Sequence, residues 1–200
     1  MKKYIVFGVI VIGILVYGLS GQQESFEDYQ KNLAQERVEK DKYMSESIDS
    51  PFRTFGDTIV RLKYFPIKEE YKVKAKIEKI ETKQYMTLGS SSGEPIKYLK
   101  YAYAHFEINK TPLKLLVLKS ITDVNGSLFT AFADKTSGDQ TYGAGRYIDL
   151  DFKNAKQITL DFNTAYNPYC NYNDQYTCPF PPAENILPVA IEAGEMDYKH

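Results

Sequence analysis

The sequence contains no tryptophan, two histidines and two cysteines among its 200 residues. A zinc site needs more soft ligands than these, because His105 and the final His200 are its histidines and Cys170 and Cys178 its cysteines. The spacing of the two cysteines also excludes a redox Cys-X-X-Cys motif. We therefore expect neither a metal centre nor a cofactor.

A strong excess of charge of either sign is also missing. The 25 Lys and Arg residues face 26 Asp and Glu residues, which leaves a formal net charge of -1. Proteins that hold nucleic acid by bulk electrostatics carry a positive excess, so we do not expect a nucleic-acid partner. The one basic stretch, Arg61–Lys83, alternates its lysines as the solvated face of a strand does.

The longest uncharged run lies at the N-terminus. Lys2 and Lys3 precede Tyr4–Leu19, and two positive charges before such a run predict that the rest of the chain is exported. Its Ile/Val content and length favour a retained anchor, whereas the small residues of Gly18-Leu19-Ser20 fit a cleaved signal. We expect a cell-envelope protein, anchored in the inner membrane with its domain in the periplasm, or secreted to the periplasm after cleavage.

The chain divides into three predicted segments. Residues 1–21 form the membrane anchor or signal segment, residues 22–50 a helical stalk, and residues 51–200 a single β-rich extracytoplasmic domain. We predict an amphipathic helix over Ser25–Ser47, because Ser25 and Asp28 fit a capping box and no Gly or Pro interrupts the segment. Its thin apolar stripe suits a stalk or a helix lying on a domain.

After Pro51 the apolar residues recur with a period of two, and 17 tyrosines with 11 phenylalanines favour β-structure. The connections are too short for crossover helices, so we predict a mainly β fold, an antiparallel sandwich or a partly open barrel. Asn109-Lys110 and Asn125-Gly126 mark hairpin turns. The predicted strands are Ile59–Phe65, Tyr71–Glu78, Glu81–Met86, Tyr98–Asn109, Leu113–Ser120, Leu128–Ala133, Tyr142–Leu150, Gln157–Asn163 and Leu187–Glu192.

The segment Asp134–Glu195 concentrates Gly, Asn, Tyr, Pro and both cysteines, with little helical character. In an oxidising compartment Cys170 and Cys178 are expected to form a disulfide that pins a lid. The candidate binding residues of this block are Asp134, Thr136, Tyr142, Arg146, Asp161, Asn163, Asn167, Glu184 and Asn185.

Two interpretations of this block remain open. In the structural one, Arg146 pairs with Asp161 or Asp134 and the asparagines tie down loop backbone. In the functional one, Arg146 offers a charged fork to a ligand, and Asp161, Asn163 and Glu184 line a pocket walled by tyrosines. His105 lies on a strand face and is expected to be a strand residue, because no Ser-His or Cys-His constellation accompanies it.

The block also carries a family resemblance. The motifs are F-A-D-K-T-S-G-D-Q-T-Y-G-A-G-R-Y-I-D-L, then L-D-F-N-T-A-Y-N-P-Y-C and T-C-P-F-P-P-A-E-N. The chain resembles, from about Tyr29 to Glu195, the bacterial and archaeal family called domain of unknown function 1684, and is similar to its Bacteroidota members. The resemblance implies no activity, cofactor or catalytic residue. Members often carry signal or lipoprotein leaders, but this chain has no lipobox cysteine.

The sequence leaves three hypotheses about function. The preferred one is a membrane-tethered binding module for a small polar ligand, a glycan or an envelope-protein partner. The alternative is a hydrolase-like enzyme that uses Asp161, Glu184 or Asp134 in acid-base or metal chemistry. The third is a structural envelope component without a pocket.

Overall fold

The computed structural model describes residues 24–53, 59–123 and 126–198. The predicted anchor Tyr4–Leu19 lies outside these residues. Among the helices that the described ranges contain, none is long and apolar enough to cross a membrane. The chain divides after Gln35 into two structural units, and the unit that begins at Glu36 holds the whole sheet.

The predicted helix is confirmed as α2, Phe26–Glu46. At its start the backbone N–H of Asp28 donates to Ser25 Oγ at 3.1 Å, so Ser25 satisfies one of the free donors of the first turn. The part of α2 from Glu36 onward belongs to the unit with the sheet. There Met44 is buried in a small cluster with Phe52, Leu62 and Tyr172.

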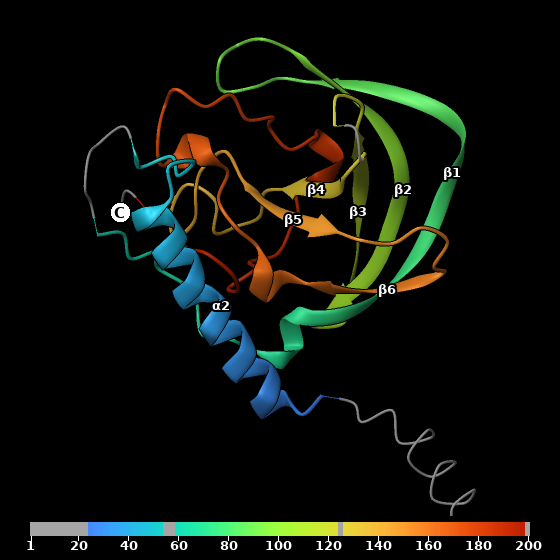
Figure 1. Ribbon diagram of the computed structural model, residues 1–200. Helices are drawn as coiled ribbons and strands as arrows, with labels where there is room; N and C mark the ends of the chain where they lie inside the picture. Colours follow the sequence, from blue (N-terminus) through green and yellow to red (C-terminus); the bar gives the residue numbers. More distant parts are fainter. Residues whose placement is uncertain (1–23, 54–58, 124–125, 199–200) are drawn as a thin grey trace, which may run out of the picture. The chain divides into compact units, whose positions relative to one another are not determined.

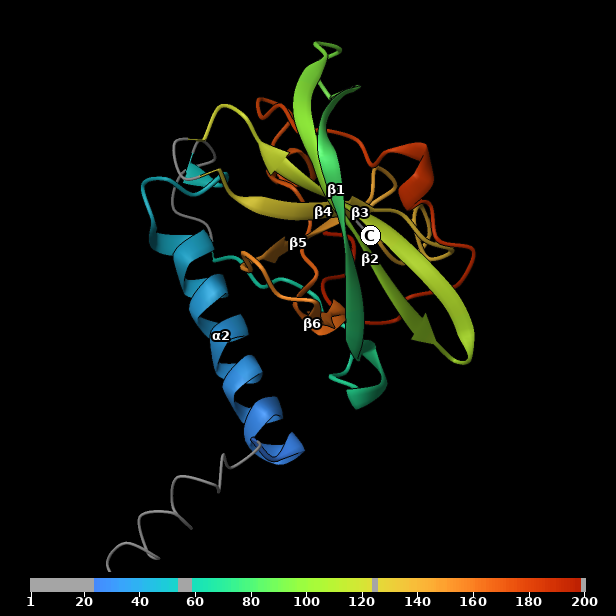
Figure 2. The same cartoon turned by 90° about the vertical axis from the view of Figure 1, so that its right-hand side faces the viewer.

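One six-stranded antiparallel sheet forms the centre of this unit (Figure 1). The prediction of a mainly β, antiparallel fold is confirmed, and the sheet is an open half-barrel with the order β5-β4-β3-β2-β1-β6. Figure 2 shows β1 and β2 as the longest ribbons, while β4 and β5 are short. The strands are β1 Lys72–Leu88, β2 Ile96–Ile108, β3 Thr111–Ser120, β4 Leu128–Phe132, β5 Arg146–Leu150 and β6 Gln157–Asp161.

The turn between β2 and β3 is confirmed as a two-residue hairpin. Asn109 and Lys110 have φ angles of 50° and 62°, the left-handed pair that such a turn requires. Of the second predicted turn, Asn125 lies outside the described residues, while Gly126 has a φ of 61°. The two predicted strands Tyr71–Glu78 and Glu81–Met86 are one strand, β1, whose register against β2 shifts between Lys79 and Gln84.

Two predicted strands are wrong for reasons that involve their backbone donors. Ile59–Phe65 is extended without joining the sheet, because Val60 N–H donates to Ser45 Oγ at 2.9 Å and Leu62 N–H to Asp41 Oδ1 at 3.1 Å. Leu187–Glu192 contains Pro188, which has no N–H to give to a ladder. It instead joins the end of β4 by scattered bonds, such as Leu187 N–H to the carbonyl of Ala133 at 2.8 Å.

Several predicted strand bounds are also corrected. Of the predicted strand Tyr142–Leu150, only Arg146–Leu150 is a strand, because the φ of 87° at Gly145 interrupts the extended backbone. Glycine is needed there, since a Cβ would lie 2.5 Å from the carbonyl oxygen of Phe132. β6 ends at Asp161, where its carboxylate accepts from the N–H of Asn163 and starts a short 3₁₀ turn. β4 ends at Phe132, one residue before the predicted end.

The main core lies on the inner face of the half-barrel. It gathers alternate residues of the long strands, among them Ala104, Phe106 and Leu115, with Phe162 and Ile191 from the C-terminal part of the chain. A smaller cluster of Leu88, Leu116 and Leu118 covers part of the other face. The segment after β6 therefore fills the concave side of the sheet.

Candidate functional site

Arg146, the centre of the predicted binding block, is completely buried. Its Nη2 donates to Asp134 Oδ2 at 2.8 Å and to the carbonyl of Ile191 at 2.9 Å, and its Nη1 donates to the carbonyls of Ala193 and Glu195. Burial lowers the pKa of the guanidinium, and the carboxylate of Asp134 opposes this shift. Arg146 thus pairs with Asp134, one of the two partners that the structural interpretation names, and it also joins the start of β5 to the C-terminal segment.

Asp134 and Thr136 form a buried turn next to this knot. Asp134 Oδ1 accepts from the backbone N–H of Thr136 at 2.8 Å and from its hydroxyl at 2.6 Å. The hydroxyl of Thr136 also meets that of Thr141 at 2.9 Å. These contacts form an Asx-type turn. Tyr142, which follows, directs its hydroxyl at Cys170 Sγ, at 3.7 Å.

The other predicted residues lie in separate networks. Asn163 Nδ2 donates to the carbonyl of Lys68 at 2.9 Å and to Asp161 Oδ1 at 3.0 Å. Asn185 is fully buried and bonds to both backbone groups of Leu116, so it fixes its 3₁₀ turn to β3. Glu184 accepts from Tyr103 at 2.8 Å on the outer face of the sheet.

The last of them, Asn167, belongs to a buried network around Glu195. Asn167 Nδ2 donates to Glu195 Oε1 at 2.9 Å, and the hydroxyl of Tyr172 donates to the same oxygen. Lys40 Nζ pairs with Glu195 Oε2 at 2.8 Å. Glu195 is fully buried whereas the Lys40 side chain is 28% exposed, so Lys40 carries the link from the network toward the surface.

A pocket of about 520 Å³ opens beside Lys40. We call it the tyrosine pocket, because five of its lining residues are tyrosines from α2, β5 and the segment after β6. None of the nine predicted binding residues is among the described residues that line it. The residues that line the tyrosine pocket are Lys40, Tyr43, Met44, Tyr147, Asp149, Tyr166, Pro168, Tyr169, Tyr176, Thr177, Cys178 and Pro179.

The rings of this pocket brace one another edge to face. The centroids of Tyr169 and Tyr176 lie 5.1 Å apart at 87°, and those of Tyr147 and Tyr166 lie 5.9 Å apart at 80°. Such pairs are favoured by the quadrupole of the ring. Burial raises the pKa of Tyr147, Tyr166 and Tyr169, so their phenols stay neutral and act as hydrogen-bonding groups.

One cation and one carboxylate complete the lining. The ammonium of Lys40 lies 5.0 Å from the centroid of the Tyr166 ring, and the hydroxyl of Tyr166 donates to Asp149 Oδ1 at 2.9 Å. Asp149 is exposed on β5, two residues beyond Tyr147 and therefore on the same face of the strand. The pocket combines apolar ring faces with a few fixed polar groups.

Cys170 and Cys178 are both buried and are not bonded to each other in this structure. The backbone N–H of Cys170 lies 3.3 Å from Cys178 Sγ, and the hydrogen bond between the two thiols lowers the pKa of Cys170 to about 6. The same bond raises the pKa of Cys178, which lines the tyrosine pocket. The disulfide stays a prediction.

The carboxylates of the hydrolase hypothesis have different partners. Asp134 is paired with Arg146, Asp161 holds Asn163, and Glu184 lies 3.1 Å from Lys100 Nζ. Among the described residues, no group of three or more His, Cys, Asp or Glu side chains could hold a metal ion. His105, a strand residue as expected, contacts Glu78 at 2.7 Å.

Sequence reasoning missed the pocket because its residues come from distant segments. Lys40 and Tyr43 lie in the helix that was predicted to be a stalk, and Asp149 lies in the predicted strand Tyr142–Leu150. A signal was present in Tyr166, Tyr169 and Tyr176, which lie within one turn-rich segment of the sequence. These tyrosines indicate an aromatic wall, but they do not indicate which residues of α2 and β5 complete the pocket.

Comparison with known proteins supports the likeness found in the sequence motifs. The model of the family described as "Protein of unknown function (DUF1684)" matches residues 58–196. The chain belongs to this family. A DUF1684 match over this range includes the whole sheet and every residue of the tyrosine pocket except the three from α2.

One solved structure is similar over nearly its whole length. It is the NMR solution structure of an uncharacterized protein of Haloarcula marismortui, with 37% identity, 87% of this chain and 97% of that chain covered, and a TM-score of 0.65. The comparison with curated proteins gives no match. Neither the DUF1684 description nor the neighbour's title gives an activity, so function is argued from the site.

Proposed function

We propose that the domain is a binding module that holds a sugar ring in the tyrosine pocket. The observation that carries the proposal is the convergence of five tyrosines on one opening of about 520 Å³, a volume typical of small-ligand sites. This proposal narrows the wider set of a small polar ligand, a glycan or a partner protein to the glycan.

A sugar ring matches the lining on both of its surfaces. Its C–H faces are apolar and pack on the faces of phenol rings, while its hydroxyl rim needs donors and acceptors. Asp149 supplies an acceptor, and the hydroxyls of Tyr43 and Thr177 supply both. Lys40 supplies N–H donors at the same opening.

An ionic ligand matches the lining less well. The charge of Lys40 is already paired with the buried Glu195, and its ammonium lies over the Tyr166 ring, where a ligand cation would otherwise lie. The remaining unpaired charge in the lining is the exposed carboxylate of Asp149, which already accepts from Tyr166. Neutral hydroxyls are therefore the better partners.

The module is proposed to work outside the cytoplasm on a membrane anchor. This part of the proposal rests on the sequence: Lys2 and Lys3 before the uncharged run Tyr4–Leu19, and the pair Cys170 and Cys178, which suits an oxidising compartment. Envelope glycans are then the sugars within reach.

The proposal is tested by binding of soluble cello-, chito- and malto-oligosaccharides to the full chain in a sugar-free detergent, measured by calorimetry. Tyr176→Ala is expected to weaken binding at least about tenfold, since loss of one stacked ring costs about 1.4 kcal/mol or more. Tyr85→Ala, at a half-exposed tyrosine of β1, is the matched control and should bind like the wild type. Equal weakening by both variants, or no binding of any saccharide, would contradict the proposal.

A further inference from the structure

A second opening lies next to the tyrosine pocket and shares a residue with it. Its volume is about 550 Å³, and we call it the charged pocket. Asp149 lines both openings. The charged pocket is lined by Tyr101, Lys119, Gly126, Ser127, Leu128, Asp149, Leu150, Asp151, Phe152 and Lys153.

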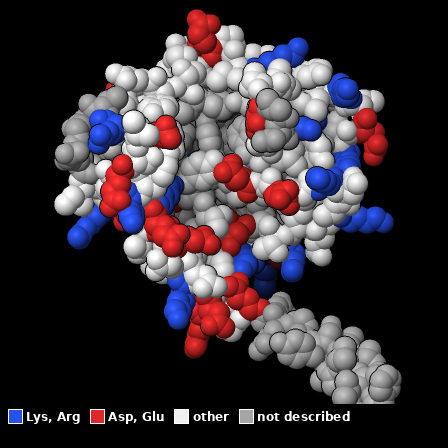
Figure 3. Space-filling model, in the orientation of Figure 1, with Lys and Arg blue, Asp and Glu red and all other residues white. Residues whose placement is uncertain are grey.

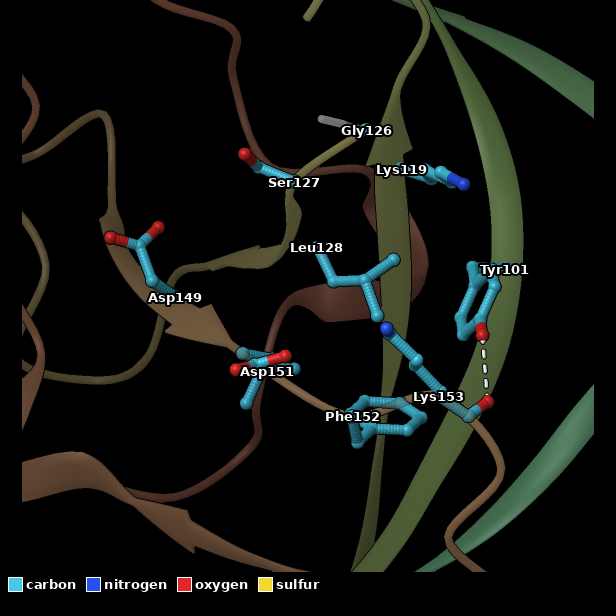
Figure 4. A pocket seen from close by; sticks show the side chains of 10 residues that line it. Tyr101, Lys119, Gly126, Ser127, Leu128, Asp149, Asp151, Phe152 and Lys153 are labelled. Atoms are coloured by element: carbon cyan, nitrogen blue, oxygen red, sulfur yellow. Dashed lines mark hydrogen bonds between the residues drawn. The ribbon is translucent and has the colours of Figure 1, made fainter. Parts of the chain in front are cut away.

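The charged pocket repeats the amphipathic lining of the first. In the view of Figure 4, the carboxylates of Asp149 and Asp151 lie on one side and the ring of Tyr101 on the other, with Leu128 and Phe152 between them. The ring of Tyr101 is braced at 67° against Phe152, and its hydroxyl donates to the carbonyl of Lys153 at 3.0 Å. An apolar floor with a polar rim again suits a hydroxylated ring.

The chain around β5 sets the distance between the two openings. Alternate residues of this stretch line the two openings. Tyr147 lines the tyrosine pocket, Asp149 lines both pockets, and Asp151 lines the charged pocket. At the rise of an extended strand, the four steps from Tyr147 to Asp151 span about 13 Å. This length exceeds a single six-membered ring and accommodates consecutive rings of a chain.

The face of the molecule on which β5 ends is hollowed. β5 ends near the centre of the face seen in Figure 1, and Figure 3 shows this face hollowed near its centre, with acidic side chains beside the hollow. The two pockets meet at Asp149, which lines both of them.

We infer that the two pockets are consecutive subsites of one cleft, and that the ligand is an oligosaccharide of at least two rings that passes over Asp149. The inference rests on the proposed function and adds the length of the ligand. One ring stacks in the tyrosine pocket, and the next lies over Leu128 and Phe152 with its hydroxyls toward Asp151 and Lys153.

The test measures affinity against chain length. The full chain is titrated with the series that binds in the oligosaccharide screen, from monosaccharide to hexasaccharide, and compared with the double variant Asp151→Ala/Lys153→Ala. Both residues line the charged pocket, and neither lines the tyrosine pocket. In the wild type, affinity should rise about tenfold or more between one ring and two or three, because the second ring binds next to an occupied subsite.

In the double variant the monosaccharide should bind as in the wild type and the gain with length should be lost. The extended cleft is overturned if the double variant keeps the gain in affinity with chain length, or if the affinity of the wild type does not depend on chain length. In either case Tyr176→Ala still tests binding in the tyrosine pocket. If no saccharide of any length binds, the proposed function fails and the extended cleft fails with it.

Discussion

At the scale of single residues, Arg146 shows how burial decides between two chemically reasonable roles. An arginine beside glycines is typical both of an anion site and of a structural ion pair. Here the guanidinium is fully buried and donates to Asp134 and to three carbonyls of the C-terminal segment. Its contacts hold the start of β5 to the chain that fills the core.

Removal of this arginine is expected to destabilise the domain strongly. Arg146→Ala leaves Asp134 buried without its partner, which costs about 3–5 kcal/mol of the free energy of unfolding. Urea denaturation followed by circular dichroism measures the change. Lys135→Ala, at the exposed lysine between Asp134 and Thr136, is the control, and its free energy of unfolding should stay within about 0.5 kcal/mol of the wild-type value. A stable Arg146→Ala domain would return Arg146 to the list of binding candidates.

The sequence shows which residues are polar, but it does not show which of them are buried. Asp134, Thr136 and Asn163 could be predicted to organise turns, because Asx-type contacts are local. The contacts of Asn185 with Leu116 and of Asn167 with Glu195 cross 69 and 28 positions of the chain, respectively. No local pattern specifies such pairs.

At the scale of elements, β5 and the segment after β6 supply most of the tyrosine pocket. Tyr147 from β5 and Tyr166 from the following segment are joined by a backbone bridge as well as by their rings. Burial raises the pKa of both phenols above the ordinary value of 10.0. The folded state therefore holds these protons more tightly than the unfolded state.

This shift predicts a loss of stability in alkali. The stabilisation is fully present below about pH 10 and is lost as pH rises above it, because only the unfolded tyrosines then release their protons. Each of the two can remove up to about 1.4 kcal/mol per pH unit. Unfolding free energies measured from about pH 9 to about pH 11 should fall less steeply with pH in Tyr147→Phe than in the wild type, whereas Tyr85→Phe should keep the wild-type slope. Equal slopes in all three proteins would contradict the account.

The strands were predictable where both partners and the turn are local. β2 and β3, with Asn109 and Lys110 between them, follow from alternation and turn chemistry. Ile59–Phe65 and Leu187–Glu192 also alternate or carry apolar runs, but their N–H groups find other acceptors or are missing at Pro188. Alternation indicates an extended chain and does not by itself provide a neighbouring strand.

At the scale of the whole molecule, the half-barrel brings distant segments to one face. A pocket that combines Lys40 with Tyr147 and Tyr176 depends on the curvature of the sheet and on the path of the chain after β6. Single-sequence patterns contain neither of these. The class of the fold could be predicted, whereas the position of the pocket could not.

The proposed location is also a property of the whole chain. Expressed in a Gram-negative host, the full chain should sediment with membranes, resist a high-salt wash, and be digested by protease added to spheroplasts. A variant lacking residues 1–21 should remain in the soluble cytoplasmic fraction and be protected. Protection of the full chain in spheroplasts would show that the domain is not exported.

The most direct test of the sugar-binding claim is an amide NMR titration of the isotope-labelled full chain with the tetrasaccharide that binds best. Sugar binding in the tyrosine pocket should shift chiefly the amides of Tyr147, Asp149, Tyr169 and Tyr176, while the amides of Tyr85 and His105 stay unchanged. Shifts centred on Glu184 and the outer face of the sheet, or no shifts at saturating saccharide, would contradict it.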